Sequence, residues 1–119
     1  MTGLEHAILG LRQALDNPRR HHMWRWLVRH RMAGVKDALT AEQGRDTDGW
    51  LAAREGTLHR EAAGLLNRLT ELGPQVLSAP DVEPVRRDLR RLLVDLEHHR
   101  QRVNDLVYDA VSLELGGSE

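Results

Sequence analysis

The histidines are the residues with the most obvious chemical potential, and the chain of 119 residues has seven of them. Glu55 lies one helical turn before His59, and His99 follows in a later segment. Imidazole and carboxylate groups are common protein ligands of zinc and non-haem iron. The sequence therefore holds the ligand types for a metal site, provided that the fold brings them together.

A second chemical feature is a basic segment that also carries tryptophans. No acidic residue occurs between Pro18 and Lys36. On a helical wheel, the face directed away from the core holds Arg19, His22, Arg25, Trp26, Arg29 and His30. Trp and Arg are enriched at the centres of protein interfaces, so this face predicts a protein partner. The alternatives are nucleic acid or another phosphate ligand, with Trp26 stacked on a base, and a solvated face held by a cation–π contact.

The residue combinations that catalysis most often needs are missing. No Ser lies in the sharp strand-to-helix turn of a hydrolase nucleophile, and the ten Gly form no phosphate-binding pattern. Cys is absent, which excludes thiolate metal sites, Cys nucleophiles and disulfides. We therefore expect a protein that is not an enzyme.

Four amphipathic helices must position these residues. Phe is absent and Tyr occurs once, which argues against strands. Hydrophobic residues recur at helical spacing in four segments. The segments are residues 3–16, residues 18–42, the stretch from a cap at Thr47 or Asp48 to a stop at Gly73–Pro74, and residues 82–115. The sequence predicts one all-α domain over residues 1–119, an antiparallel up-down-up-down four-helix bundle with a short first and a long last helix.

The predicted helices differ in length. At a rise of about 1.5 Å per residue, the first spans roughly 20 Å and the last roughly 50 Å. Val107, Val111 and Leu115 would then extend beyond the first helix. Either the second and third helices cover this apolar end, or a homodimer covers it by pairing two last helices.

Several histidines fall at similar positions along the axis of such a bundle. Counted from the predicted connections, an imidazole falls near mid-height on every helix, at His6, His30, His59 and His98–His99. This plan resembles that of the hemerythrin-like proteins, in which His and carboxylate ligands from four antiparallel helices hold two irons. The resemblance implies a metal centre in the bundle core.

The direction of each side chain limits which histidines can meet there. At about 100° per residue, His6 and His30 face away from the apolar stripes, so the ligand set for two irons is incomplete. One alternative is a smaller zinc or iron site of Glu55, His59 and His99. The other is a buried polar layer that fixes which helices pair, made of Arg31, Glu55, His99 and Arg100.

The net charge of the chain is close to zero, so it gives no general attraction to nucleic acid or to anionic lipid. Lys and Arg number 17 against 18 Asp and Glu, so the net charge of −1 favours a protein partner over nucleic acid. No apolar run approaches the roughly 18 residues of a membrane span, and the N-terminus lacks a signal-peptide pattern. We expect a small cytoplasmic interaction or regulatory protein, with no cofactor and no membrane contact.

Overall fold

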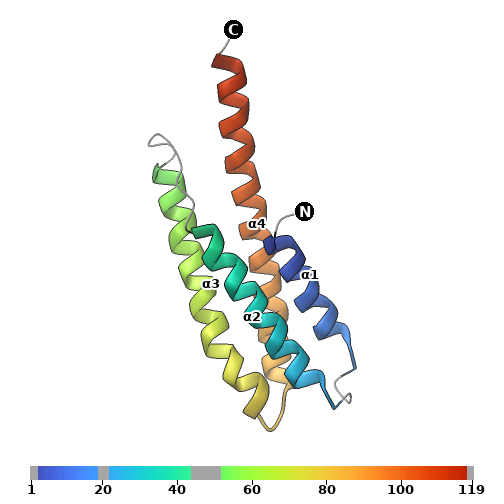
Figure 1. Ribbon diagram of the computed structural model, residues 1–119. Helices are drawn as coiled ribbons and strands as arrows, with labels where there is room; N and C mark the ends of the chain where they lie inside the picture. The colour runs from blue at the N-terminus through green and yellow to red at the C-terminus, as the bar shows by residue number, and fades with distance from the viewer. Residues whose placement is uncertain (1–2, 19–21, 44–51, 118–119) are drawn as a thin grey trace.

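The structure is a computed structural model of four helices packed side by side (Figure 1). It describes residues 3–18, 22–43 and 52–117, and the side chains of these residues except 52–55 and 110–117. The helices are α1 (Gly3–Asp16), α2 (Trp24–Gln43), α3 (Ala52–Ser78) and α4 (Glu83–Gly117). The described residues form no strand, which confirms the all-α prediction.

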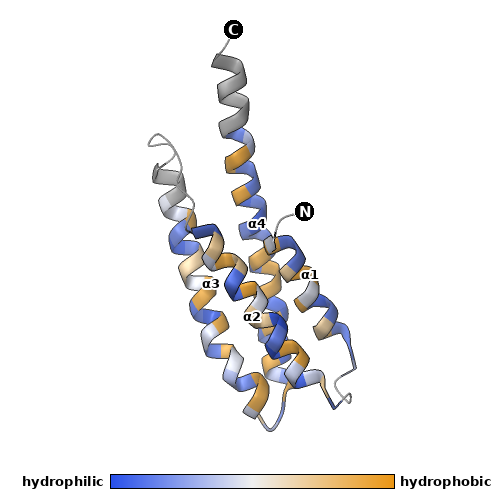
Figure 2. Ribbon diagram, in the orientation of Figure 1, coloured by the Kyte–Doolittle hydropathy of each residue, from blue (hydrophilic) through white to orange (hydrophobic). Residues whose placement is uncertain are grey.

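The core is built from one apolar stripe of each helix. α1 buries Leu4, Ile8, Leu11 and Leu15, and α2 buries Trp24, Val28, Met32, Val35 and Leu39. These residues recur every three or four positions, which is the helical spacing that the sequence predicts. Hydrophobic and hydrophilic residues are interspersed along the coloured part of each helix (Figure 2), as expected where an apolar stripe and a polar face share one helix. Each fully buried Leu, Val or Met contributes about 1.5–3 kcal/mol. Packing of these stripes therefore supplies most of the stability of the helices.

α2 begins at Trp24, so the predicted start at Pro18 is wrong. Leu27 N donates to the carbonyl of Met23, which closes the first helical turn. Trp24 is buried, whereas Pro18 and Met23 are exposed. Most helical stability in proteins comes from a packed face. Because the packed face of α2 starts at Trp24, the exposed His22 and Met23 gain little from being helical.

The predicted helix stop at Gly73–Pro74 is also wrong, because α3 continues through both residues to Ser78. None of the described Gly has a positive φ, so Gly73 does not form a left-handed cap. Val76, beyond the proline, is fully buried in the core. Its burial stabilises one more helical turn and offsets the hydrogen bond that Pro74 cannot make.

α4 is the longest helix, with 35 residues, and its C-terminal part extends past the other three (Figure 1). The Asp81 carboxylate accepts a hydrogen bond from Glu83 N at 3.1 Å and caps the first turn. Over the described residues, none of the four helices contains an apolar stretch that could span a lipid bilayer.

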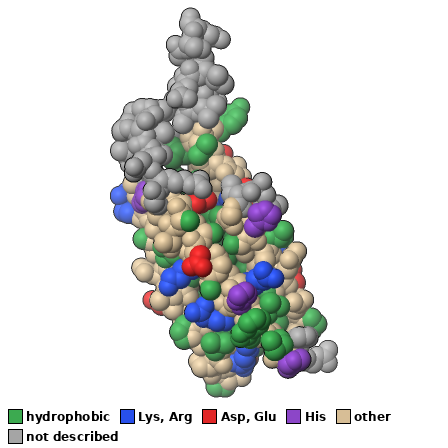
Figure 3. All heavy atoms as spheres, in the orientation of Figure 1, with side chains coloured by type: hydrophobic (Ala, Val, Ile, Leu, Met, Phe, Trp, Pro, Cys, Tyr) green, Lys and Arg blue, Asp and Glu red, His purple; other side chains and the backbone are tan. Residues whose placement is uncertain are grey.

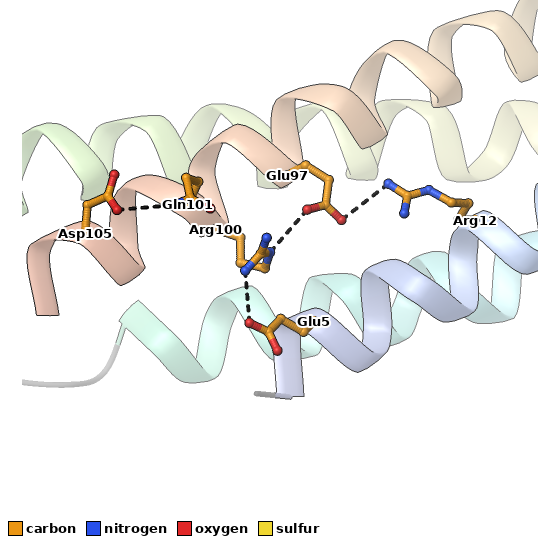
Figure 4. Close-up of polar contacts among 6 residues, drawn as sticks. All are labelled: Glu5, Arg12, Glu97, Arg100, Gln101 and Asp105. Atoms are coloured by element: carbon orange, nitrogen blue, oxygen red, sulfur yellow. Dashed lines mark hydrogen bonds and ion pairs between the residues drawn. The ribbon is translucent and has the colours of Figure 1, made fainter. Parts of the chain in front are cut away.

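Ion pairs join α1 to α4 in a defined order (Figure 4). Arg100 Nη1 lies 2.9 Å from Glu5 Oε1, and Arg100 Nε lies 3.2 Å from Glu97 Oε2. Arg12 Nη2 contacts the other oxygen of Glu97 at 3.3 Å. Nearer the other end of α1, Asp16 contacts Arg90 at 2.9 Å. The pairs place the start of α1 beside Arg100. None of these ion pairs joins α1 to the part of α4 that follows Arg100.

Candidate functional site

Trp26 is the most exposed large aromatic side chain of α2. Its side chain is 56% exposed, as the helical wheel predicts. The indole ring stacks on His30 one turn later, with ring centroids 5.2 Å apart and planes 8° apart. His22 and Met23 are also exposed at this end of α2. We call His22, Met23, Trp26 and His30 the Trp26 surface.

The space-filling view shows hydrophobic and histidine side chains together with basic ones over the N-terminal half of α2 (Figure 3). Two of these cations, Arg25 and Arg29, have a structural position between α2 and α3. The half-buried Arg25 donates its Nη1 to the carbonyl oxygens of Ala79, Val76 and Leu77, at 2.6, 3.3 and 3.4 Å. These carbonyls belong to the last turn of α3 and its exit, where helical partners run out. Arg25 therefore caps α3.

Arg29 lies against Gly73 of α3. A Cβ atom built on Gly73 would lie only 3.1 Å from Arg29 Nε, so the lack of a side chain at Gly73 makes room for the guanidinium. Arg29 is half-buried in this position. Arg19, the remaining predicted interface residue, lies outside the described residues. The structure thus brings Trp26 and His30 together on the surface of α2. Arg25 and Arg29 lie beside them, on the side of α2 that faces α3.

The structural use of Arg25 and Arg29 is not predicted from the sequence, because the local pattern ends the third helix at Gly73. A helix that continues to Ser78 brings carbonyl oxygens within reach of Arg25. The buried Val76, four residues after Leu72 on the same stripe, is the sequence signal that could have extended α3.

His99 is the one buried polar residue among the described side chains, with 3% exposure. Its Nδ1 lies 2.7 Å from Glu61 Oε1, and Arg102 Nη2 lies 2.7 Å from Glu61 Oε2. Burial raises the pKa of Glu61, but the hydrogen bonds and charges of Arg102 and His99 outweigh it, so the pKa falls below its ordinary value of 4.5. Glu61 is therefore ionised at neutral pH.

The predicted polar layer has different members from those that the structure shows. Arg31 is exposed and packs over Gly10 of α1, so its placement in a buried layer is wrong. Arg100 bonds Glu5 and Glu97 instead of His99. The partner of His99 is Glu61, which is not among the predicted members of the layer. Glu61 lies three residues after Leu58 and four before Leu65, and this spacing places it beside the apolar stripe.

The residues of the predicted metal site are only partly described. His59 and His99 line one cavity, whereas the side chain of Glu55 lies outside the described residues. Within the described segments, no group of three His, Asp or Glu side chains could hold a metal ion. His6 and His30 are exposed, as their direction on the helical wheel predicts. A zinc or iron site with Glu55 stays a prediction.

Comparisons with protein-family models, with curated proteins and with solved structures gave no match. The similarity to the hemerythrin-like plan therefore stays a prediction from the sequence.

Proposed function

We propose that this protein acts by binding a protein partner through the Trp26 surface. The observation that carries the proposal is the 56% exposure of Trp26 beside a stacked His30, on a helix whose other face is fully buried. A rigid aromatic side chain can bury a large area with little loss of conformational entropy, which is why Trp is frequent among the residues that dominate binding energy. The Trp26–His30 stack also fixes the indole before binding, which lowers the entropic cost further.

The charge around this surface indicates the chemistry of the partner. Arg31 and Lys36 are exposed cations of α2, and no acidic residue occurs between 18 and 36. A partner that offers an apolar pocket for the indole and carboxylates at the pocket's rim would complement both features.

Nucleic acid or another phosphate ligand is the alternative occupant of the same surface. The positions of Arg25 and Arg29 favour the protein partner, because one guanidinium is bonded to α3 carbonyls and the other packs on Gly73. Phosphate binding depends on accessible cations and weakens steeply with salt.

Affinity capture from the native source tests the proposal. We expect the wild-type chain to retain a protein that Trp26→Ala loses. Val94→Ala is the matched control, because Val94 is an apolar α4 side chain with 53% exposure and lies outside the Trp26 surface. Equal capture by Trp26→Ala, or no captured protein at all, would contradict the proposal. Capture that nuclease abolishes and salt weakens steeply would favour the nucleic-acid alternative.

We further propose that the four helices run up-down-up-down and that the chain forms a homodimer through α4. The order of the α1–α4 ion pairs supports opposite directions for these two helices, because the α4 partner number falls as the α1 number rises. Exposed Val107 and Tyr108, at 57% and 73%, support a second copy packing on α4. Light scattering should give the mass of a dimer, and a monomer mass at high concentration would exclude it.

A further inference from the structure

A cavity opens between the C-terminal part of α2, the N-terminal part of α3 and the middle of α4. It lies at the end of the bundle that α1 does not reach. Its volume is about 110 Å³. The walls are mainly apolar and include Leu39 of α2, Ala62 of α3 and Leu106 of α4. None of its lining residues belongs to α1. For comparison, an engineered apolar cavity of about 150 Å³ takes up benzene. The present cavity is smaller, but it is open to solvent beside the exposed Val107, so its size and lining suit a ligand of about one ring.

His99 supplies a hydrogen-bonding group to this apolar space. The ring lines the cavity and is 97% buried, and its one hydrogen bond among the described residues runs from Nδ1 to Glu61. A carboxylate only accepts hydrogen bonds, so Nδ1 of His99 carries a proton and Nε2 is the ring nitrogen left for a ligand. A ligand bound here would therefore need a group that can hydrogen-bond to Nε2, as a hydroxyl group can.

Glu42 restricts the ligand further. It lines the same cavity, and its Oε2 atom is buried with no hydrogen-bond partner among the described residues. The nearby Gln43 amide is engaged, because its Nε2 donates to the carbonyl of His59 at 3.3 Å. A buried carboxylate oxygen without a partner favours a donor and disfavours an anion.

We infer that this cavity binds a small uncharged phenol, with the ring between α2, α3 and α4 and the hydroxyl hydrogen-bonded to His99 Nε2. The apolar walls account for the ring and the buried imidazole accounts for the hydroxyl. Glu42 accounts for the exclusion of carboxylic acids, which are anions at neutral pH. This inference is independent of the Trp26 surface.

Titration with three probes of matched size tests the inference. p-Cresol, toluene and 4-methylbenzoate share a methyl-substituted ring and differ in the group opposite the methyl. Binding is followed by NMR through the methyl signals of Val103 and Leu106, both of which line the cavity. We expect p-cresol to bind about tenfold more tightly than toluene, because one buried hydrogen bond contributes roughly that factor. We expect no shift with 4-methylbenzoate.

Two variants assign the hydroxyl contact to His99. His99→Leu should bind p-cresol about tenfold more weakly, which removes the preference over toluene. His98→Leu is the control, because His98 is the exposed neighbour and should leave both affinities unchanged. Circular dichroism checks that both variants keep the helical content of the wild type. A second variant, Glu42→Gln, should allow 4-methylbenzoate to bind, since it removes the negative charge.

Several results would overturn the inference. The first is that p-cresol does not bind to the wild type. The second is that p-cresol and toluene bind with equal affinity. The third is that the NMR chemical-shift changes map to residues outside the cavity. Binding of one zinc ion per chain that displaces p-cresol would assign the cavity to metal instead. A dimer whose interface closes the cavity to p-cresol would assign it to a second copy.

Discussion

His99 Nδ1 lies 2.7 Å from Glu61 Oε1, and this contact joins α4 to α3 at the edge of the apolar core. Glu61 is held on its other side by Arg102, so one carboxylate orders a buried imidazole and a surface guanidinium. A buried polar group that finds a partner favours one arrangement of helices, because in another arrangement it would be left unsatisfied. The pair therefore selects the register between α3 and α4.

The lowered pKa of Glu61 makes this contribution to stability depend on pH. A carboxyl group whose pKa is lower in the folded than in the unfolded state stabilises the fold fully above its unfolded pKa, near 4.5. The contribution is lost as pH falls through the folded pKa. Urea unfolding from about pH 7 to about pH 3 should show wild type more stable than Glu61→Gln at neutral pH, with the difference shrinking below 4.5.

The control for this experiment is Glu71→Gln, on the exposed surface of α3. It removes the same charge away from His99 and Arg102 and should change stability little at any pH. A difference between wild type and Glu61→Gln that stays constant down to the acid end would show that the charge of Glu61 is not what stabilises the pair.

The cap that Arg25 places on α3 gives a second prediction. Hydrogen bonds to charged groups contribute roughly 1.5–3 kcal/mol, and Arg25 is half-buried, so Arg25→Ala should lower the free energy of unfolding by about 1–2 kcal/mol. Arg87→Ala, on the exposed side of α4, should change it by less than about 0.5 kcal/mol. Equal denaturation midpoints for Arg25→Ala and Arg87→Ala would contradict the assignment of Arg25 as a cap of α3.

Two glycines of α3 separate helix propensity from packing. Gly64 has open space where a Cβ would lie, so Gly64→Ala should stabilise the chain by about 0.5–1 kcal/mol. At Gly73 the same methyl group would crowd Arg29 at 3.1 Å. Thermal unfolding should therefore show a smaller gain, or a loss, for Gly73→Ala. Equal gains at both positions would mean that the approach of Arg29 to α3 is not constrained.

Much of the fold follows from the sequence, because apolar spacing fixes which face of a helix is buried. The bounds of α1 and the exposure of Trp26 are both predicted from that spacing. Local rules fail where tertiary packing outweighs them, as at Gly73–Pro74, where burial of Val76 continues the helix.

The side-chain partners were harder to predict than the helices. His99 is correctly predicted to be buried, but a wheel gives only a direction and not the neighbour that the direction meets. The pairing of His99 with Glu61, and of Arg100 with Glu5 and Glu97, depends on helix register. Register is set by packing of the whole bundle, which single-helix periodicity does not contain.

The environments of the two tryptophans give a prediction on stability. Trp26→Ala should change the free energy of unfolding by less than about 1 kcal/mol, because the side chain is mostly exposed. Trp24→Ala should cost about 3–5 kcal/mol, because Trp24 is 2% exposed within the core. Chemical denaturation of both variants measures these values. A loss at Trp26 as large as at Trp24 would make Trp26 a core residue.

The affinity of the captured protein for Trp26→Ala, measured by calorimetry against wild type and Val94→Ala, tests the central claim most directly. A dominant interface residue contributes about 2 kcal/mol or more, so Trp26→Ala should raise Kd by roughly thirtyfold while Val94→Ala leaves it unchanged. A Kd for Trp26→Ala within about twofold of wild type would contradict the assignment of the Trp26 surface as the binding site.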